Sequence, residues 1–259
     1  MAHRAAEGLR RRGAGFPRLR ARWSGRPRRA LIFFGRAPEP GRVKTRLIPP
    51  LDPAAAARLY AALLQDLAFL LLRVRAEVRL AAYDPAAPAG RLLPHLPRAF
   101  DLIPQEGMDL GQRMERALEG AFRRGAGVAV LVGSDCPSLR PQVVEEALRA
   151  LEEGGKEAVL GPSHDGGYYL VGARRPVPAL FEGQRWSHPG VYRESVRRAR
   201  AAGIRLGEVA PGFDLDRWED LLLLSRLLRR AEWREALPRT VSLMAAGVGR
   251  GLPWSLRGG

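Results

Sequence analysis

The 259-residue chain has one cysteine, Cys136, no asparagine, and only two lysines, Lys44 and Lys156. A single cysteine cannot form an intramolecular disulfide, which fits a reducing compartment. The N-terminus is positively charged but has no apolar segment behind it, so we do not expect a secretory signal. The richest apolar stretch, residues 61–74, is interrupted by polar side chains and is too short to span a membrane. We therefore expect a cytoplasmic protein with no membrane partner.

Acidic residues are scarce at the N-terminus, where most of the excess positive charge lies. The formal net charge is +16, and residues 1–30 hold ten arginines and one glutamate, which leaves +7 for residues 31–259. Residues 1–29 show no periodicity and are rich in Arg, Gly and Pro, which predicts a basic disordered arm. The arm could bind an acidic surface or could be a solvated tail. Nucleic acid is not the expected partner, because the rest of the chain is only mildly basic and carries no recognised nucleic-acid motif.

Apolar segments indicate a layered α/β fold. The continuous runs at residues 30–34 and 128–132 are typical of central parallel strands, which are buried on both faces. The predicted strands are 30–34, 77–83, 100–103, 128–132, 158–160, 168–171 and 204–209. The predicted helices are 53–74, 109–124, 141–154, 189–201 and 217–230. Such alternation favours a single α/β domain with a mostly parallel central sheet. We expect an arm at 1–29, this domain at 30–237 and an irregular tail at 238–259.

Positive side chains and glycines follow the first predicted strand. Residues 35–46 contain Arg36, Arg42, Lys44 and Arg46 between two glycines. Glycine lets a backbone approach a ligand closely, and arginine offers forked donors to phosphate oxygens. A di- or triphosphate site is the favoured interpretation, with Arg36, Lys44 and Arg46 as its ligands, and an exposed basic turn is the alternative. The segment does not match the Walker A pattern.

A carboxylate, Asp135, directly follows the central strand 128–132. Ligands of open α/β sheets bind beyond the carboxyl ends of the strands, so this side chain can reach a bound cation. Mg²⁺ and Mn²⁺ prefer oxygen ligands and often use one or two carboxylates together with substrate phosphates. The alternative is that Asp135 caps the next helix, although Pro141 at a first helical position moves that cap nearer to Arg140.

Two further acidic segments come later in the chain. Asp165 precedes the pair Gly166-Gly167 between two predicted strands, where it could bind a substrate or act as a base, or could simply begin a tight turn. Asp214 and Asp216 are two residues apart before a helix, and in an extended segment both would face one side. They could share one cation, or Asp216 could cap the helix.

Taken in order, these motifs resemble a known bacterial family. The motifs are residues 35–47, Asp-Leu-Gly-Gln-Arg-Met at 109–114, Gly-Ser-Asp-Cys-Pro at 133–137, Asp-Gly-Gly-Tyr-Tyr-Leu at 165–170, and Asp-Leu-Asp at 214–216. Over residues 30–230 the chain resembles GT-A-like transferases that carry a glycosyltransferase name and are linked by name to arsenosugar biosynthesis. Their superfamily, the nucleotide-diphospho-sugar transferases, includes the phospholactate and molybdenum-cofactor guanylyltransferases.

The resemblance implies a nucleotide beyond the sheet edge and a divalent metal, Mg²⁺ or Mn²⁺, on carboxylates. Asp135 matches the family's aspartate after the central strand, Asp214 or Asp216 matches its late acidic pair, and Lys44 with Arg46 matches its Lys-Thr-Arg segment. The usual nucleotidyltransferase opening, Gly-x-Gly-x-x-[Ser/Thr]-Arg-Met, is absent, which puts nucleotidyl transfer second.

The predicted function is therefore metal-dependent glycosyl transfer from a nucleotide sugar to a small acceptor, with Asp135 and Asp165 as catalytic residues, Asp135, Asp214 and Asp216 as metal ligands, and Gly166 and Gly167 at the substrate. The alternatives are a nucleotidyltransferase that joins an NTP to a small phosphorylated acid or sugar phosphate, and a basic-armed nucleic-acid-binding protein without catalysis. The oligomeric state stays open.

Overall fold

The first strand of the fold, β1, begins one residue before the predicted boundary. The computed structural model describes residues 26–247, so most of the predicted arm and the end of the predicted tail lie outside the described residues. β1 spans Arg29–Gly35 and is buried along almost its whole length. Its alternate side chains enter two separate cores, Leu31 and Phe33 on one face and Ala30 and Ile32 on the other. This two-sided burial explains why the segment reads as a continuous apolar run.

Seven strands form one sheet in the order β3-β2-β1-β4-β6-β5-β7. The other strands are β2 (Val78–Tyr83), β3 (Asp101–Pro104), β4 (Val128–Gly133), β5 (Ala158–Pro162), β6 (Tyr168–Ala173) and β7 (Leu206–Glu208). β6 is antiparallel to both of its neighbours, and the remaining pairings are parallel. The predicted mostly parallel sheet is confirmed. Because β1, β2, β3 and β4 run in one direction, the loops that follow them meet at one edge.

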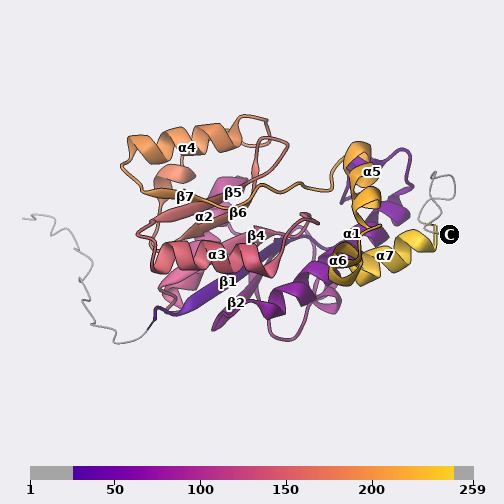
Figure 1. Ribbon diagram of the computed structural model, residues 1–259, viewed down its shortest axis with the longest axis horizontal. Coiled ribbons are helices and arrows are strands. Elements are labelled where there is room, and N and C mark those ends of the chain that lie inside the picture. Colours follow the sequence, from indigo (N-terminus) through magenta and orange to yellow (C-terminus); the bar gives the residue numbers. More distant parts are fainter. Residues whose placement is uncertain (1–25, 248–259) are drawn as a thin grey trace, which may run out of the picture.

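Helices cover both faces of this sheet (Figure 1). The helices are α1 (Pro53–Leu70), α2 (Leu110–Arg123), α3 (Pro141–Glu152), α4 (Val191–Ala201), α5 (Trp218–Leu227), α6 (Ala231–Ala236) and α7 (Pro238–Ala245). Residues of α1 and α3 pack into one core, and residues of α2 and α4 pack into the other. Two layers of helices around one sheet make the predicted α/β architecture.

α1 is the most apolar helix. Asp52 caps it by accepting a hydrogen bond from Ala55 N at 2.7 Å. Together with a 3-10 turn it spans Pro53–Arg73, with a mean hydropathy of 1.5, which by length and composition is enough to cross a membrane. The interrupted apolar run had argued against this, but 67% of that window is buried inside the protein, as a core helix requires.

The C-terminal segment corrects one prediction. Residues 238–245 form helix α7 rather than an irregular tail, and α6 and α7 lie beside α1 at one end of the molecule (Figure 1). Asp66 of α1 holds α7 in place. Its buried carboxylate accepts hydrogen bonds from Arg239 N at 3.1 Å, from Thr240 N at 2.8 Å and from Thr240 Oγ1 at 2.9 Å. An acid inside an apolar helix therefore supplies the N-terminal partner that the sequence of α7 does not contain.

Candidate active site

A cleft of about 900 Å³ opens at the edge where the parallel strands end. Its walls come from the segments after β1 and β4, from the β5–β6 turn and from residues 213–217. The size suits a small-molecule ligand, and the position is where open α/β sheets bind ligands. Every site residue predicted from the sequence except Gly166 lines this cleft.

Lys44 lies at the centre of the charged groups. Its Nζ donates to Asp135 Oδ2 at 3.0 Å and to Asp216 Oδ1 at 2.7 Å, and its side chain is 5% exposed. The two carboxylates are 37% and 36% exposed and so face the cleft. The predicted phosphate ligand and two of the predicted metal ligands thus form one ionic cluster, which we call the Lys44 cluster.

The backbone and α1 both hold Lys44 in this position. Lys44 adopts φ 49° and ψ 39°, a left-handed conformation that is uncommon for a residue with a side chain and that concentrates at functional sites. Its Nζ lies 5.6 Å from the centre of the Tyr60 ring. The Tyr60 hydroxyl accepts from Arg36 N at 3.1 Å and lies 2.7 Å from Ser134 Oγ, so one buried tyrosine ties the loop after β1 to the end of β4.

The charges within the Lys44 cluster stabilise one another. Burial alone would lower the pKa of Lys44, but the Asp135 and Asp216 carboxylates outweigh it and raise the pKa above its ordinary value. Burial would raise the pKa of Asp216, and the Lys44 ammonium overcomes this and lowers it. Both partners therefore stay ionised at neutral pH. Neither aspartate acts as a helix cap, because Arg140 occupies the N-cap of α3 and Arg217 that of α5.

Asp214 is the most deeply buried acid of the site. Its Oδ2 accepts from Ser163 Oγ at 2.8 Å, while its buried Oδ1 has no partner among the described residues. Burial, followed by the negative charge of Asp135, raises the pKa of Asp214 well above its usual range. An unpartnered buried carboxylate oxygen beside another carboxylate is a position that a cation would stabilise.

The donor set fits a hard divalent cation. Asp135, Asp214 and Asp216 offer carboxylate oxygens, which Mg²⁺ and Mn²⁺ prefer. The described residues nevertheless contain no group of three side chains already arranged around a common metal position. Instead, the Lys44 ammonium stands between Asp135 and Asp216. This occupant shows that the position attracts a cation.

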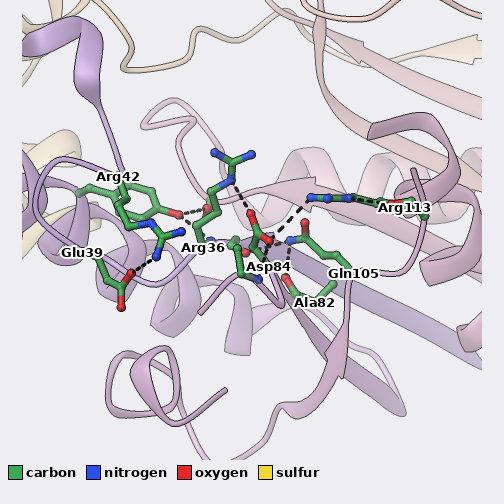
Figure 2. Close-up of polar contacts among 12 residues, drawn as sticks. Arg36, Glu39, Arg42, Ala82, Asp84, Gln105 and Arg113 are labelled. Atoms are coloured by element: carbon green, nitrogen blue, oxygen red, sulfur yellow. Dashed lines mark hydrogen bonds and ion pairs between the residues drawn. The ribbon is translucent and has the colours of Figure 1, made fainter. Parts of the chain in front are cut away.

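Arginines extend the positive charge along the cleft. Arg46 approaches Asp216 at 3.8 Å and keeps a 61% exposed side chain. Arg36 lies at the start of the loop after β1, the loop that also contains Lys44, and its Nε is 3.3 Å from Asp84. Arg113 of α2 is 3.8 Å from the other oxygen of Asp84 (Figure 2). Asp84 thus holds two guanidinium groups at the cleft wall, and their remaining donors stay available for an anionic ligand.

Gln105, directly after β3, has a fixed orientation at the cleft floor. Its Nε2 donates to Gly35 O and to Ala82 O, both at 2.9 Å (Figure 2). Two carbonyl acceptors identify the nitrogen and leave Oε1 as the group that can accept a hydrogen bond from a ligand. Gln105 was not predicted as a site residue. Its position just after a predicted strand, at the edge where ligands bind, could have indicated it.

In the β5–β6 turn, Asp165 and Gly166 have the structural roles of a tight turn, which was the alternative to substrate binding. Asp165 Oδ1 accepts from Gly167 N at 2.8 Å, as in a tight turn that begins with aspartate. Gly166 has φ 89°, and a Cβ there would lie 2.0 Å from Pro189 O, so this glycine serves packing against the neighbouring turn. Asp165 and Gly167 still line the cleft, and the second carboxylate oxygen of Asp165 is not used by the turn.

The fold and this cleft define a class of proteins, the nucleotide-diphospho-sugar transferase fold. The chain is 33% identical to a proposed nucleotide-diphospho-sugar transferase from Desulfovibrio desulfuricans G20, with a TM-score of 0.77, and the match covers 86% of this chain and 96% of that chain. Residues 67–188 match the family described as "Uncharacterized protein conserved in bacteria (DUF2064)". The chain belongs to the same family as the Desulfovibrio desulfuricans protein.

More distant solved structures share the fold. CMP:2-keto-3-deoxy-manno-octonic acid synthetase, complexed with CTP, is 15% identical with a TM-score of 0.50, covering 78% of this chain and 98% of that chain. 4-diphosphocytidyl-2C-methyl-D-erythritol synthase from Anaerococcus prevotii DSM 20548 is 9% identical with a TM-score of 0.53, covering 79% and 97%. These proteins are a synthetase and a synthase by name, and their likeness to this chain is one of fold. No curated protein matches the chain at a significant level.

Proposed function

We propose that the protein is a transferase that uses a nucleotide sugar and passes its glycosyl group to a small acceptor. The observation that carries this proposal is the placement of Lys44, Asp135 and Asp216 in one ionic cluster at the carboxyl edge of the sheet. The family relationship to a proposed nucleotide-diphospho-sugar transferase supports the choice of donor.

The positive side chains have a defined task in this reaction. When the bond between the sugar and the diphosphate breaks, negative charge grows on the leaving diphosphate. Lys44 and Arg46 lie where they can accept that charge, and preorganised donors of this kind commonly contribute a factor of about 10²–10³ in rate. A divalent metal held by Asp135 with Asp214 or Asp216 would add Lewis-acid neutralisation of the same phosphates.

The acceptor would bind beside the β5–β6 turn. Asp165 presents its free carboxylate oxygen there and can orient an acceptor hydroxyl or take its proton. Gln105, Arg36 and Arg113 form the other end of the cleft, where they can contact the nucleotide.

Thermal unfolding with a ligand panel tests this assignment. UDP, GDP, CDP, their sugars and the NTPs are compared with and without Mn²⁺ or Mg²⁺. A ligand at a hundred times its Kd stabilises the fold by about 2.7 kcal/mol. We expect a metal-dependent shift with one nucleotide sugar, and its loss in Asp135→Asn but not in the control Asp101→Asn, which changes an exposed acid at the amino end of β3.

The products separate the two transferase chemistries. Glycosyl transfer releases a nucleoside diphosphate, whereas nucleotidyl transfer to a phosphorylated acid or sugar phosphate releases pyrophosphate from an NTP. A stronger shift with an NTP, together with pyrophosphate release, would overturn the glycosyl assignment in favour of nucleotidyl transfer. Binding of nucleic acid that vanishes when residues 1–25 are removed, with no nucleotide response, would overturn both.

A further inference from the structure

The Lys44 ammonium binds carboxylates that are also proposed ligands of the divalent cation. Lys44 Nζ contacts Asp135 Oδ2 at 3.0 Å and Asp216 Oδ1 at 2.7 Å, and its side chain is almost fully buried between them. Both carboxylates are among the candidate ligands that the proposed function considers for the metal, which are Asp135 together with Asp214 or Asp216. A divalent cation bound between the same two oxygens, Asp135 Oδ2 and Asp216 Oδ1, would take the position of the ammonium, because that position cannot hold both cations.

We propose that Lys44 is a resident cation that a divalent ion displaces, and that the displaced ammonium moves to the phosphates of the nucleotide. This inference rests on the proposed function and adds an order to it. The metal alone binds weakly because it must expel Lys44, whereas the metal and a diphosphate bind tightly together because the phosphates give the expelled ammonium a new partner.

The charges of the cluster support this exchange. Asp135, Asp216 and Lys44 together carry one negative charge, so the carboxylates are only partly neutralised while Lys44 is in place. A divalent cation would neutralise both carboxylates but would leave the ammonium beside it without an anion. A bound diphosphate removes that repulsion. By linkage, whatever factor the phosphate adds to metal affinity, the metal adds to phosphate affinity.

The side chain of Lys44 can move while its backbone stays in place. Lysine carries its charge as a compact point on a flexible stem and has no fixed fork to hold it. The residue precedes a short 3-10 turn, Thr45–Leu47, and sits in a left-handed conformation at φ 49°. Gly41, three residues earlier in the same loop, has φ 75°, and nothing lies within 4 Å of the place that a Cβ would take there, so the loop has free space on that side.

The first test uses the wild-type chain, which has only two lysines. Acylation of the two lysine side-chain amines is followed by mass spectrometry with and without saturating Mn²⁺. We expect Lys44 to react slowly without metal and at least several-fold faster with it, while Lys156, which does not line the cleft, keeps its rate. Bound Mn²⁺ that leaves the Lys44 rate unchanged would overturn the exchange, because the ammonium would then have stayed in place.

The second test compares Mn²⁺ affinities by electron paramagnetic resonance. Without the competing ammonium, Lys44→Met should bind Mn²⁺ about 10-fold more tightly than wild type, within the 5–150-fold range usual for coupled sites. Lys156→Met is the matched control, and Lys44→Met combined with Asp135→Asn should lose the gain. Equal affinities of wild type and Lys44→Met would refute the proposal.

A third measurement follows cooperativity with inorganic pyrophosphate. In wild type, Mg²⁺ and pyrophosphate together should raise the melting temperature by more than the sum of their separate effects, and this surplus should shrink in Lys44→Met. The outcomes also separate this inference from the proposed function. Metal-dependent nucleotide binding without Lys44 exchange leaves the function standing and removes the inference, whereas Mn²⁺ binding enhanced by Lys44→Met with no nucleotide response does the reverse.

Discussion

Two buried cations flanked by two carboxylates lie at opposite edges of the same sheet, and β1 connects them. At the amino end of β1, Arg29 donates to Glu152 through Nε at 2.7 Å and through Nη2 at 2.6 Å. Its Nη1 donates to Glu145 at 2.7 Å. Beyond the carboxyl end, Lys44 contacts Asp135 and Asp216. We call the first the Arg29 cluster.

The clusters differ in cation type and in exposure. Arg29 presents a rigid fork, and its partner Glu152 is 2% exposed, so the Arg29 cluster is closed to solvent on that side. Lysine presents a movable point charge, and the carboxylates around it are more than a third exposed. Both cations are buried, so burial of the cation does not distinguish the proposed site from the other cluster. The solvent access of the carboxylates does, at 37% and 36% for Asp135 and Asp216 against 25% and 2% for Glu145 and Glu152.

The Arg29 cluster should be the more costly one to break. Arg29→Met leaves the two glutamates without their cation, and removing one member of a buried ion pair typically destabilises a fold by about 3–5 kcal/mol. Urea denaturation would measure the loss. Arg28→Met is the control, because Arg28 is a more exposed neighbour, and its effect should stay within about 0.5 kcal/mol. Similar losses for the two variants would mean that the Arg29 cluster does not hold the fold together.

Asp66 is a buried carboxylate outside both clusters. Its hydrogen bonds come mainly from the start of α7. Asp66→Ala leaves those donors unpaired and should cost about 2–3 kcal/mol, from the lost cap and the unsatisfied N–H groups. Hydrogen exchange should show residues 238–245 losing protection first. Glu235→Ala, which changes an exposed acid in α6, is the control. Unchanged protection of α7 would contradict this role.

The open Lys44 cluster should tolerate loss of its cation better. Lys44→Met leaves Asp135 and Asp216 facing each other, but water reaches both, so we expect a loss of only about 1–2 kcal/mol in the absence of metal. Mn²⁺ should restore this loss, because it replaces the missing charge. The same ion should not rescue Arg29→Met. Rescue of both variants, or of neither, would erase the distinction between the two clusters.

The sequence predicted where the site lies better than how its members meet. Lys44 follows β1 and Asp135 follows β4, and parallel pairing of these strands brings both residues to one edge, as the predicted mostly parallel sheet implied. That Lys44 pairs directly with both Asp135 and Asp216 was not predictable, because Lys44 and Asp216 are 172 residues apart and the distance depends on side-chain placement.

Other residues escaped prediction because their role depends on packing between elements. Tyr60 reads as one more core position of α1, and only the fold shows that its hydroxyl joins the loop after β1 to Ser134. α7 was missed because its N-terminal partner, Asp66, belongs to another helix. Local patterns predict elements, whereas contacts between distant elements decide which polar groups are satisfied.

Asp214 gives the smallest effect and one of opposite sign. Burial and the nearby Asp135 raise its pKa, so the folded state holds its proton more tightly than the unfolded chain does. Stability contributed by Asp214 is therefore lost as the pH rises above the ordinary carboxyl pKa of 3.8 towards the raised pKa of the folded state.

Asp214→Asn removes this penalty and should stabilise the metal-free protein by about 1 kcal/mol at neutral pH. Denaturation at several pH values should show the advantage shrinking as the pH falls, until below 3.8 wild-type Asp214 becomes protonated in the unfolded state as well as in the folded state. Excess Mn²⁺ should narrow the advantage at neutral pH, because it stabilises the ionised wild-type carboxylate if Asp214 is a ligand. An advantage that is equal at all pH values would instead mean that packing, and not charge, sets the strain at Asp214.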